Sequence, residues 1–257
     1  KTPRPRNVPP VDQLSACPHH SISTETSSPG LGMHGATALC STCPHPKRGE
    51  GAEAMLHVID HNSGANGDVL RAMFEARKQV FVDLLKWDVP VIGGTFEIDE
   101  FDDGHAAYLV LTDASGAHLA SARLLKTVRP HILGTLFPAL CESAVPRAHD
   151  TREITRFCLD RRLKAHARRS ARDRLVSGLA EYALNQGVRR YTAVAEQAWL
   201  RQIQAFGWIC HPLGAAQRHA DADIAALLIH IDAETPARLA AAGIWSAPDH
   251  PPLQRAA

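Results

Sequence analysis

Three features are missing from this 257-residue sequence, and each absence narrows the class of protein. No segment approaches the roughly 20 consecutive apolar residues that span a bilayer, and the N-terminus has no apolar core of the signal-peptide type. The net charge is only +1, so the overall balance gives no reason to expect a nucleic-acid-binding protein. With 45% hydrophobic residues the chain can still bury a normal core. We therefore expect a cytoplasmic globular protein without a membrane span.

Cysteine is scarce in the regular part of the chain. Cys141, Cys158 and Cys210 are widely spaced in apolar surroundings. This is typical of reduced, packed thiols in an intracellular enzyme, and a disulfide framework is not expected.

Residues 1–54 differ in composition from the remainder. They are rich in Pro, Ser, Thr, His and Gly and show neither a helical nor a strand period, so we expect a disordered tail. The tail has one C-x-x-C pair, Cys40 and Cys43, but no second well-spaced pair, which favours an unstructured tail over a zinc knuckle. Codons for residues 47–51 could contain a ribosome-binding site, and Met55 directly precedes an apolar segment. We therefore divide the chain into a tail, 1–54, and one domain, 55–257, with Met55 as a candidate native start.

The chain becomes regular from residue 66. Apolar residues at helical spacing predict an amphipathic helix over residues 66–86, and two further helices are expected, from a Ser170 cap to Gly187 and over 198–206. Strand patterns cover residues 106–111, 119–125, 154–159, 191–194 and 224–231, the first two forming a hairpin. This alternation predicts an α/β sandwich whose strands are partly parallel.

Arg77 departs from the helical pattern because it lies on the apolar stripe, four residues from both Met73 and Phe81. A buried guanidinium must find an anionic partner, although an arginine at the edge of the stripe can also extend to solvent. The acidic loop 96–103 supplies acids that can pair with Arg77, Arg123 and Arg156, and solvated acidic loops are also common. Together these charges predict a site.

These residues, in this order and spacing, resemble the LuxI-type autoinducer synthases. The resemblance covers roughly residues 55–231, including Gly207-Trp208 and Pro212-Leu213-Gly214. The matching residues are Arg77 with Val80-Phe81, Trp87, Glu97-x-Asp99-x-Phe101-Asp102, Arg123-Leu124-Leu125 with Thr127 and Pro130, Phe137, and Glu153-x-x-Arg156-Phe157.

The resemblance implies a fold and a reaction. The fold is a GNAT-like acyltransferase sandwich, in which helices flank a twisted mixed sheet with a V-shaped cleft. The reaction acylates the amine of S-adenosylmethionine from an acyl thioester, carried on acyl carrier protein or coenzyme A, then closes the lactone and releases methylthioadenosine. The product is an acyl-homoserine lactone, a quorum-sensing signal. No metal or bound cofactor is implied.

The resemblance also suggests roles for individual residues. The attacking amine must be neutral, yet a free α-amino group has a pKa of roughly 8, so a base helps and Glu153 is the candidate. Arg156 is the second catalytic candidate. Two residues three apart in a regular strand face opposite sides, so either a bulge brings them together or one of them is structural. We assign the S-adenosylmethionine pocket to Arg77, Phe81, Trp87, Asp99, Asp102, Arg123 and Phe137.

A basic segment, residues 161–174, contains six Arg and one Lys against one Asp. It is either a solvated helix start or a docking surface for acyl carrier protein or for coenzyme A phosphates. The candidate docking residues are Arg161, Arg162, Lys164, Arg168 and Arg169.

Two other functions compete with the synthase. A GNAT-type N-acyltransferase using acyl-CoA is disfavoured because residues 159–174 lack the glycines of the usual pyrophosphate loop. A nucleic-acid-binding module is weakly supported because the basic segment has no interleaved aromatic residues. Ala195-Glu196 replaces a Thr or Ser that often accompanies 3-oxo acyl groups in the family, which favours an unsubstituted or 3-hydroxy chain. The sequence leaves chain length and acyl donor open.

Overall fold

The structure is a computed structural model that describes residues 54–60 and 66–246. The chain divides into two compact units, residues 1–47 and 48–257, and all the described residues belong to the second. Apart from Ala54, the predicted tail with its C-x-x-C pair lies outside the described residues. Cys141, Cys158 and Cys210 are free thiols, as expected. Among the described helices, none combines the length and the apolarity that crossing a membrane requires.

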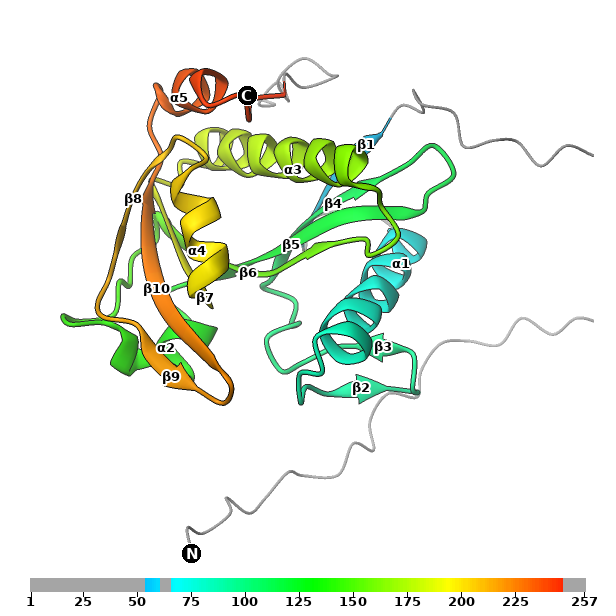
Figure 1. Cartoon of the computed structure of the whole chain (residues 1–257), viewed down its shortest axis with the longest axis horizontal. Coiled ribbons are helices and arrows are strands. Elements are labelled where there is room, and N and C mark those ends of the chain that lie inside the picture. Colours follow the sequence, from blue (N-terminus) through cyan, green and yellow to red (C-terminus); the bar gives the residue numbers. More distant parts are fainter. Residues whose placement is uncertain (1–53, 61–65, 247–257) are drawn as a thin grey trace, which may run out of the picture. The chain divides into compact units, whose positions relative to one another are not determined.

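A mixed eight-stranded sheet forms the centre of this unit (Figure 1). Its strands pair in the order β1-β4-β5-β6-β7-β10-β8, and β9 pairs with β10. The pairing of β6 with β7 is parallel and the others are antiparallel. Two short strands, β2 and β3, form a separate sheet. The strand bounds are β1 Met55–Ile59, β2 Val91–Ile92, β3 Phe96–Glu97, β4 Ala107–Thr112, β5 His118–Lys126, β6 Thr151–Leu159, β7 Arg190–Glu196, β8 Ile209–Pro212, β9 Gln217–His219 and β10 Ala222–His230.

The sheet splits between its two parallel strands. β6 and β7 pair only from Thr151 and Arg190 to Ile154 and Ala193, so the last five residues of β6 have no partner on β7. Figure 1 shows β6 and β10 running apart beyond this point. The sheet is therefore continuous only at one end of this parallel pair.

Helices cover both faces of the sheet. Side chains alternate along a strand, so Leu109 and Tyr108 of β4 face opposite sides. Leu109 packs in the apolar cluster that includes α3 (Ala165–Gln186), whereas Tyr108 packs in the cluster that includes Met73 of α1 (Gly67–Arg77). The other helical segments are η1 Lys78–Leu84, which is π-helical, α2 Ile132–Thr135, η2 Pro138–Leu140, which is a 3₁₀ turn, α4 Gln197–Gln204 and α5 Thr235–Ala241. The predicted α/β sandwich, a mixed sheet flanked by helices, is confirmed.

Most element boundaries lie close to those expected from the sequence. The hairpin turn is held by the Asp113 carboxylate, which accepts hydrogen bonds from the N–H groups of Ser115 and Ala117. Gly187 ends α3 in the left-handed region, at φ 67°. The predicted Ser170 cap is wrong, because α3 begins at Ala165 and Ser170 lies within the helix. The basic segment therefore forms the first turns of α3 and not only its approach.

Candidate functional site

Arg77 is buried at the C-terminal end of α1, with 1% of its surface exposed. Its Nε donates to Glu97 Oε2 at 2.5 Å. Its Nη1 and Nη2 donate to the two carboxylate oxygens of Asp102, each at 2.8 Å. The expectation that a buried Arg77 finds anionic partners in the acidic loop is confirmed, and the partners are Glu97 and Asp102.

Arg123 on β5 anchors the same loop from the sheet. Its guanidinium donates to both oxygens of Asp99, at 2.5 and 3.0 Å, and its Nη1 lies 2.9 Å from Asp102 Oδ1. Its Nε donates to Thr155 Oγ1 at 2.9 Å, and the Tyr108 hydroxyl donates to Asp102 Oδ1 at 3.0 Å. Every side-chain donor nitrogen of Arg123 is therefore in use, which fixes the position of the acidic loop on the sheet.

A β-bulge in β6 re-aims Arg156. Between the pairs Ser121–Cys158 and Arg123–Thr155 the register shifts, so β6 carries one residue more than β5. Arg156 lies at this point with φ 48°, a left-handed backbone conformation that is uncommon outside glycine.

The bulge resolves the conflict between Glu153 and Arg156, which would face opposite sides of a regular strand. Arg156 reaches the acidic loop, where its Nε and Nη2 donate to Glu97 Oε1 at 3.1 and 3.0 Å. Its Nη2 also donates to Asp99 Oδ2 at 2.7 Å. Arg156 thus binds the same loop as Arg123. Arg123 lies two residues from Leu125 on β5, and Leu125 is the register partner of Glu153, so Arg123 and Glu153 face the same side of the sheet. Bulged residues of this kind are frequent beside active sites.

Three arginines and three carboxylates alternate in this cluster, so their formal charges balance. Burial alone would raise the pKa of Asp102, but the hydrogen bonds and charge of Arg77, with the charge of Arg123, hold it well below its usual range. Burial would lower the pKa of Arg77, but Asp102 and Glu97 raise it above its usual value. The cluster is a charge-balanced wall held together by buried ion pairs.

Aromatic rings flank this wall. The rings of Phe81 and Trp87 stack, with centroids 4.8 Å apart and planes 15° apart, and the Arg156 guanidinium lies 5.7 Å from the Phe81 centroid. Phe81 belongs to the π-helical segment η1, an irregularity that is frequent at functional sites. Trp87 is 38% exposed, so part of its indole is open to a ligand.

Glu153 is fully buried beside the wall, in an environment that favours its neutral form. Its Oε1 accepts a hydrogen bond at 2.8 Å from the N–H of Leu133, in the first turn of α2. Its Oε2 has no hydrogen-bond partner among the described residues. Burial raises the pKa of Glu153 to about 7, against the opposing effects of the Leu133 and Ile132 N–H groups and of the Arg123 charge. A carboxylate with a pKa near neutrality and one free oxygen is well suited to act as a general base.

The other assigned residues lie elsewhere. Phe137, between α2 and η2, contacts the His219 ring edge-to-face at 5.0 Å and packs against two apolar clusters, so the structure does not place it in the charged wall. Arg162 forms an ion pair with Asp160, and Arg168 donates to the carbonyl oxygens of Leu159 and Asp160. The remaining docking candidates, Arg161, Lys164 and Arg169, are exposed and form no ion pair within the described residues.

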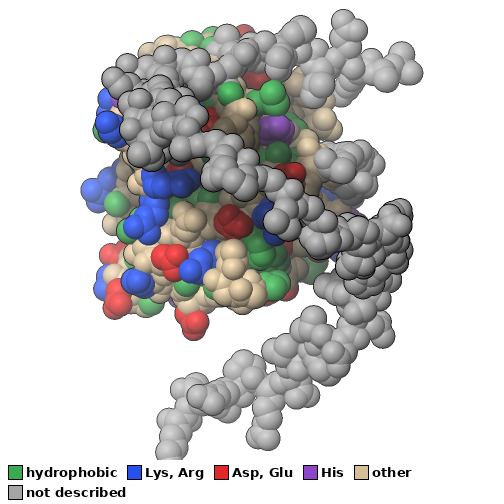
Figure 2. All heavy atoms as spheres, turned by 90° about the vertical axis from the view of Figure 1, so that its right-hand side faces the viewer, with side chains coloured by type: hydrophobic (Ala, Val, Ile, Leu, Met, Phe, Trp, Pro, Cys, Tyr) green, Lys and Arg blue, Asp and Glu red, His purple; other side chains and the backbone are tan. Residues whose placement is uncertain are grey.

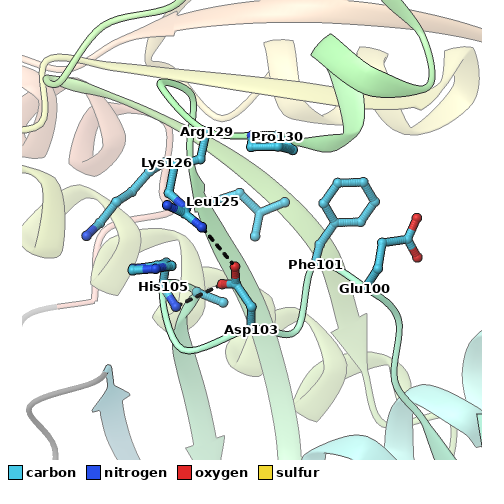
Figure 3. A pocket seen from close by; sticks show the side chains of 9 residues that line it. Glu100, Phe101, Asp103, His105, Leu125, Lys126, Arg129 and Pro130 are labelled. Carbon is cyan, nitrogen blue, oxygen red and sulfur yellow. Dashed lines mark hydrogen bonds and ion pairs between the residues drawn. The ribbon is translucent and has the colours of Figure 1, made fainter. Parts of the chain in front are cut away.

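A cavity of about 150 Å³ lies beside the acidic loop, which contributes Glu100, Phe101 and Asp103 to its lining (Figure 3). Its lining includes Phe101 and Pro130, and an ion pair of 3.6 Å between Arg129 and Asp103 bridges its two loops. None of the assigned catalytic or binding residues lines it. On the face of the molecule that Figure 2 presents, acidic and basic side chains are interspersed among apolar ones.

Sequence reasoning missed three polar residues of this region. Thr155 had a detectable signal, because its spacing of two from Glu153 places both on one face of a strand. Tyr108 had none, since it lies in an apolar strand where an aromatic residue is ordinary. Thr192, which pairs with Glu153 across β6 and β7, depends on a strand register that one sequence does not reveal.

Comparison with known proteins agrees with this geometry. Residues 60–239 match the autoinducer synthase family. The acyl-homoserine-lactone synthase of Ralstonia nicotianae is 32% identical over 190 residues, which are 71% of this chain and 92% of that protein.

Solved structures give the same result. The structure of a CoA-dependent acyl-homoserine lactone synthase, MesI, is 31% identical, has a TM-score of 0.65, and covers 75% of this chain and 97% of that chain. The structure of another CoA-dependent synthase, BjaI, with SAM and isopentyl-CoA, is 26% identical, has a TM-score of 0.66, and covers 74% and 88%. The chain described here belongs to the autoinducer synthase family.

Proposed function

We propose that this chain is a cytoplasmic acyl-homoserine-lactone synthase that uses S-adenosylmethionine and an acyl thioester. The observation that carries the proposal is Glu153, a buried carboxylate with one unpartnered oxygen, placed beside a charge-balanced wall at the split in the sheet. Family membership supports it, as does the likeness to a synthase solved with SAM and isopentyl-CoA. We propose no metal or resident cofactor.

The first step is acylation of the S-adenosylmethionine amine. Glu153 Oε2 accepts a proton from the ammonium group, and the neutral amine attacks the thioester carbonyl. With a pKa of about 7, Glu153 is about half ionised at neutral pH, and its ionised form is basic enough to take a proton from a group with a pKa of roughly 8. In this proposal, backbone N–H groups at the Arg156 bulge stabilise the oxyanion.

The second step closes the lactone. The carboxylate of the acylated intermediate attacks its own γ-carbon, and the C–S bond of the sulfonium breaks, so that methylthioadenosine leaves as a neutral thioether. The protein mainly has to hold a folded conformer, which is an entropic contribution. The wall of Arg77, Asp99, Asp102 and Arg123 would supply a rigid boundary, and the exposed part of Trp87 a face for the sulfonium.

The acyl donor reaches the site from the α3 side in this proposal. Arg161, Lys164 and Arg169 surround the start of α3, where exposed cations suit either coenzyme A phosphates or the acidic surface of acyl carrier protein. The likeness to two CoA-dependent synthases supports acyl-CoA. Carrier protein as donor rests on the charge alone.

The test is mass spectrometry of solvent extracts from cells expressing residues 55–257, with Glu153→Gln as the matched control. We expect a series of acyl-homoserine lactones from the first and a strongly reduced series from the second. If no lactone appears, and purified protein given acyl thioesters and S-adenosylmethionine releases no methylthioadenosine, the proposal is wrong. An N-acyltransferase then becomes the working hypothesis.

A further inference from the structure

Four side chains form one row across the sheet, at the level of Glu153. Leu125 on β5 is the register partner of Glu153 on β6, Glu153 is the partner of Thr192 on β7, and Thr192 is the partner of Leu228 on β10. Register partners on neighbouring strands point to the same face. Glu153 and Thr192 are therefore adjacent polar side chains between two leucines.

Both polar side chains carry an oxygen that has no partner. Glu153 and Thr192 are fully buried, and neither Glu153 Oε2 nor Thr192 Oγ1 has a hydrogen-bond partner within the described residues. Buried polar groups are hydrogen-bonded in the great majority of cases, and an unpaired one needs an explanation. Valine has nearly the same shape as threonine and would fill this position without an unpaired hydroxyl, so packing alone does not account for Thr192.

Glu153 and Thr192 lie at the end of the pairing between β6 and β7. The next row, Ile154 and Ala193, is the last one in which β6 and β7 pair, and both residues point into the core under α3. Glu153 and Thr192 are thus the last paired residues on their own face. Beyond them the strands separate, so the two oxygens lie at the apex of the split in the sheet.

We propose that Thr192 is a substrate-contacting residue of the acylation step, an inference that rests on the synthase function proposed above. Thr192 Oγ1 accepts a hydrogen bond from one N–H of the attacking amine, while Glu153 Oε2 accepts the proton that the amine gives up. Two contacts on adjacent strands hold the nitrogen in place beside the acyl carbonyl that it attacks. The contribution of Thr192 is orientation of the nucleophile.

The step balances as follows. The ammonium group transfers one proton to Glu153, the nitrogen lone pair forms the C–N bond, and the C–S bond breaks as the tetrahedral intermediate collapses. The thiolate takes the proton held by Glu153 and leaves as the thiol, and the second amine proton passes to solvent. Thr192 keeps its own proton throughout.

The experiment compares Thr192→Val with Thr192→Ser, using purified protein, S-adenosylmethionine and the best of a panel of acyl-CoA and acyl-carrier thioesters. Thiol release reports acylation, and thermal unfolding reports folding. We expect Thr192→Val to lower kcat for thiol release about tenfold, the effect of one lost hydrogen bond, with KM for the acyl donor unchanged. Thr192→Ser keeps the hydroxyl and should remain within about threefold of the wild type. Thr112→Val, at a buried threonine on β4, is the matched control and should leave kcat unchanged.

The two variants separate chemistry from packing. Thr192→Val should unfold at the wild-type temperature or above it, because it removes a buried hydroxyl that has no protein partner. Wild-type kcat in Thr192→Val, or an equal loss in Thr192→Val and Thr192→Ser, would overturn the inference and leave the synthase function intact. A wild-type protein that releases neither thiol nor methylthioadenosine from any donor would instead refute the synthase function, and this inference with it.

Discussion

Replacing Arg77 by methionine tests whether the charged wall holds the site together. The substitution keeps an unbranched side chain of similar length on the apolar stripe but removes three hydrogen bonds to Glu97 and Asp102. Both carboxylate side chains have no exposed surface. The balanced cluster of three arginines and three carboxylates would be left with one uncompensated negative charge in the interior.

The size of the effect follows from that burial. Breaking a buried ion pair by removing one partner costs about 3–5 kcal/mol, which for a domain of this size lowers Tm by about 10 °C. Glu97 would still pair with Arg156, and Asp102 with Arg123, so we expect a loss of unfolding free energy in the lower part of that range. The control is Arg129→Met, which breaks an exposed ion pair with Asp103 and should cost no more than about 1 kcal/mol.

The pH dependence gives a second signature of the same substitution. In the wild type the pKa of Asp102 is depressed, so its pairing contributes stability above pH 4, and this contribution is lost as the pH falls further. In Arg77→Met the excess carboxylate can take up a proton at a higher pH, which neutralises the unpaired charge. The difference in unfolding free energy between the two proteins should therefore shrink between pH 7 and pH 4.

Urea unfolding at pH 7 and pH 4, followed by intrinsic fluorescence, measures both effects. Equal stability of Arg77→Met and wild type at pH 7 would refute the claim that the wall is a buried ion-pair network. A difference that stays constant or grows toward pH 4 would refute the explanation in terms of an unpaired carboxylate. Arg77→Lys keeps the positive charge but not the planar guanidinium, so its unfolding free energy should lie between those of the wild type and Arg77→Met.

Three further predictions concern catalysis and binding. Glu153→Gln should lower lactone formation by at least about 100-fold. The variant should also unfold at a higher temperature than the wild type at pH 8 but not at pH 4, because burial raises the folded pKa of Glu153 to about 7 and the wild type therefore loses stability as the pH rises toward 7. Melting temperatures that keep the same order at both pH values would contradict this. Trp87→Ala should raise KM for S-adenosylmethionine by about threefold to tenfold, whereas Trp87→Phe, which keeps an aromatic face, should stay close to wild type in steady-state assays. Reversing charge in Lys164→Glu with Arg169→Glu should raise KM for the acyl donor by about tenfold without changing kcat, while Arg218→Glu, another exposed cation, should change neither.

Much of the fold could be predicted because its elements are strongly patterned. The apolar period located α1, and the strands of the hairpin were recognisable from their flanking turn. The short elements carried no comparable signal. α2 has four residues and β2 has two, which is too few for any period to show, and yet α2 supplies the N–H group that binds Glu153.

The charged wall was predictable in kind but not in detail. A guanidinium on an apolar stripe needs an anionic partner unless it extends to solvent, and the acidic loop offered several acids, so a pairing of Arg77 with this loop could be anticipated. Which acid pairs with which arginine depends on a bulge at Arg156, where the backbone adopts a positive φ at a residue other than glycine. No sequence pattern announces that conformation, because it is imposed by the contacts that Arg156 makes with Glu97 and Asp99.

The same bulge links the stability of the site to its chemistry. A left-handed backbone at Arg156 costs on the order of 1–3 kcal/mol, and it persists because the guanidinium is held by two buried carboxylates. If those carboxylates were protonated or removed, β6 could return to a regular pleat, and Arg156 would turn away from the face that carries Glu153. The charges of the wall therefore maintain the strand irregularity that turns Arg156 toward the acidic loop, on the face that carries Glu153, the proposed general base.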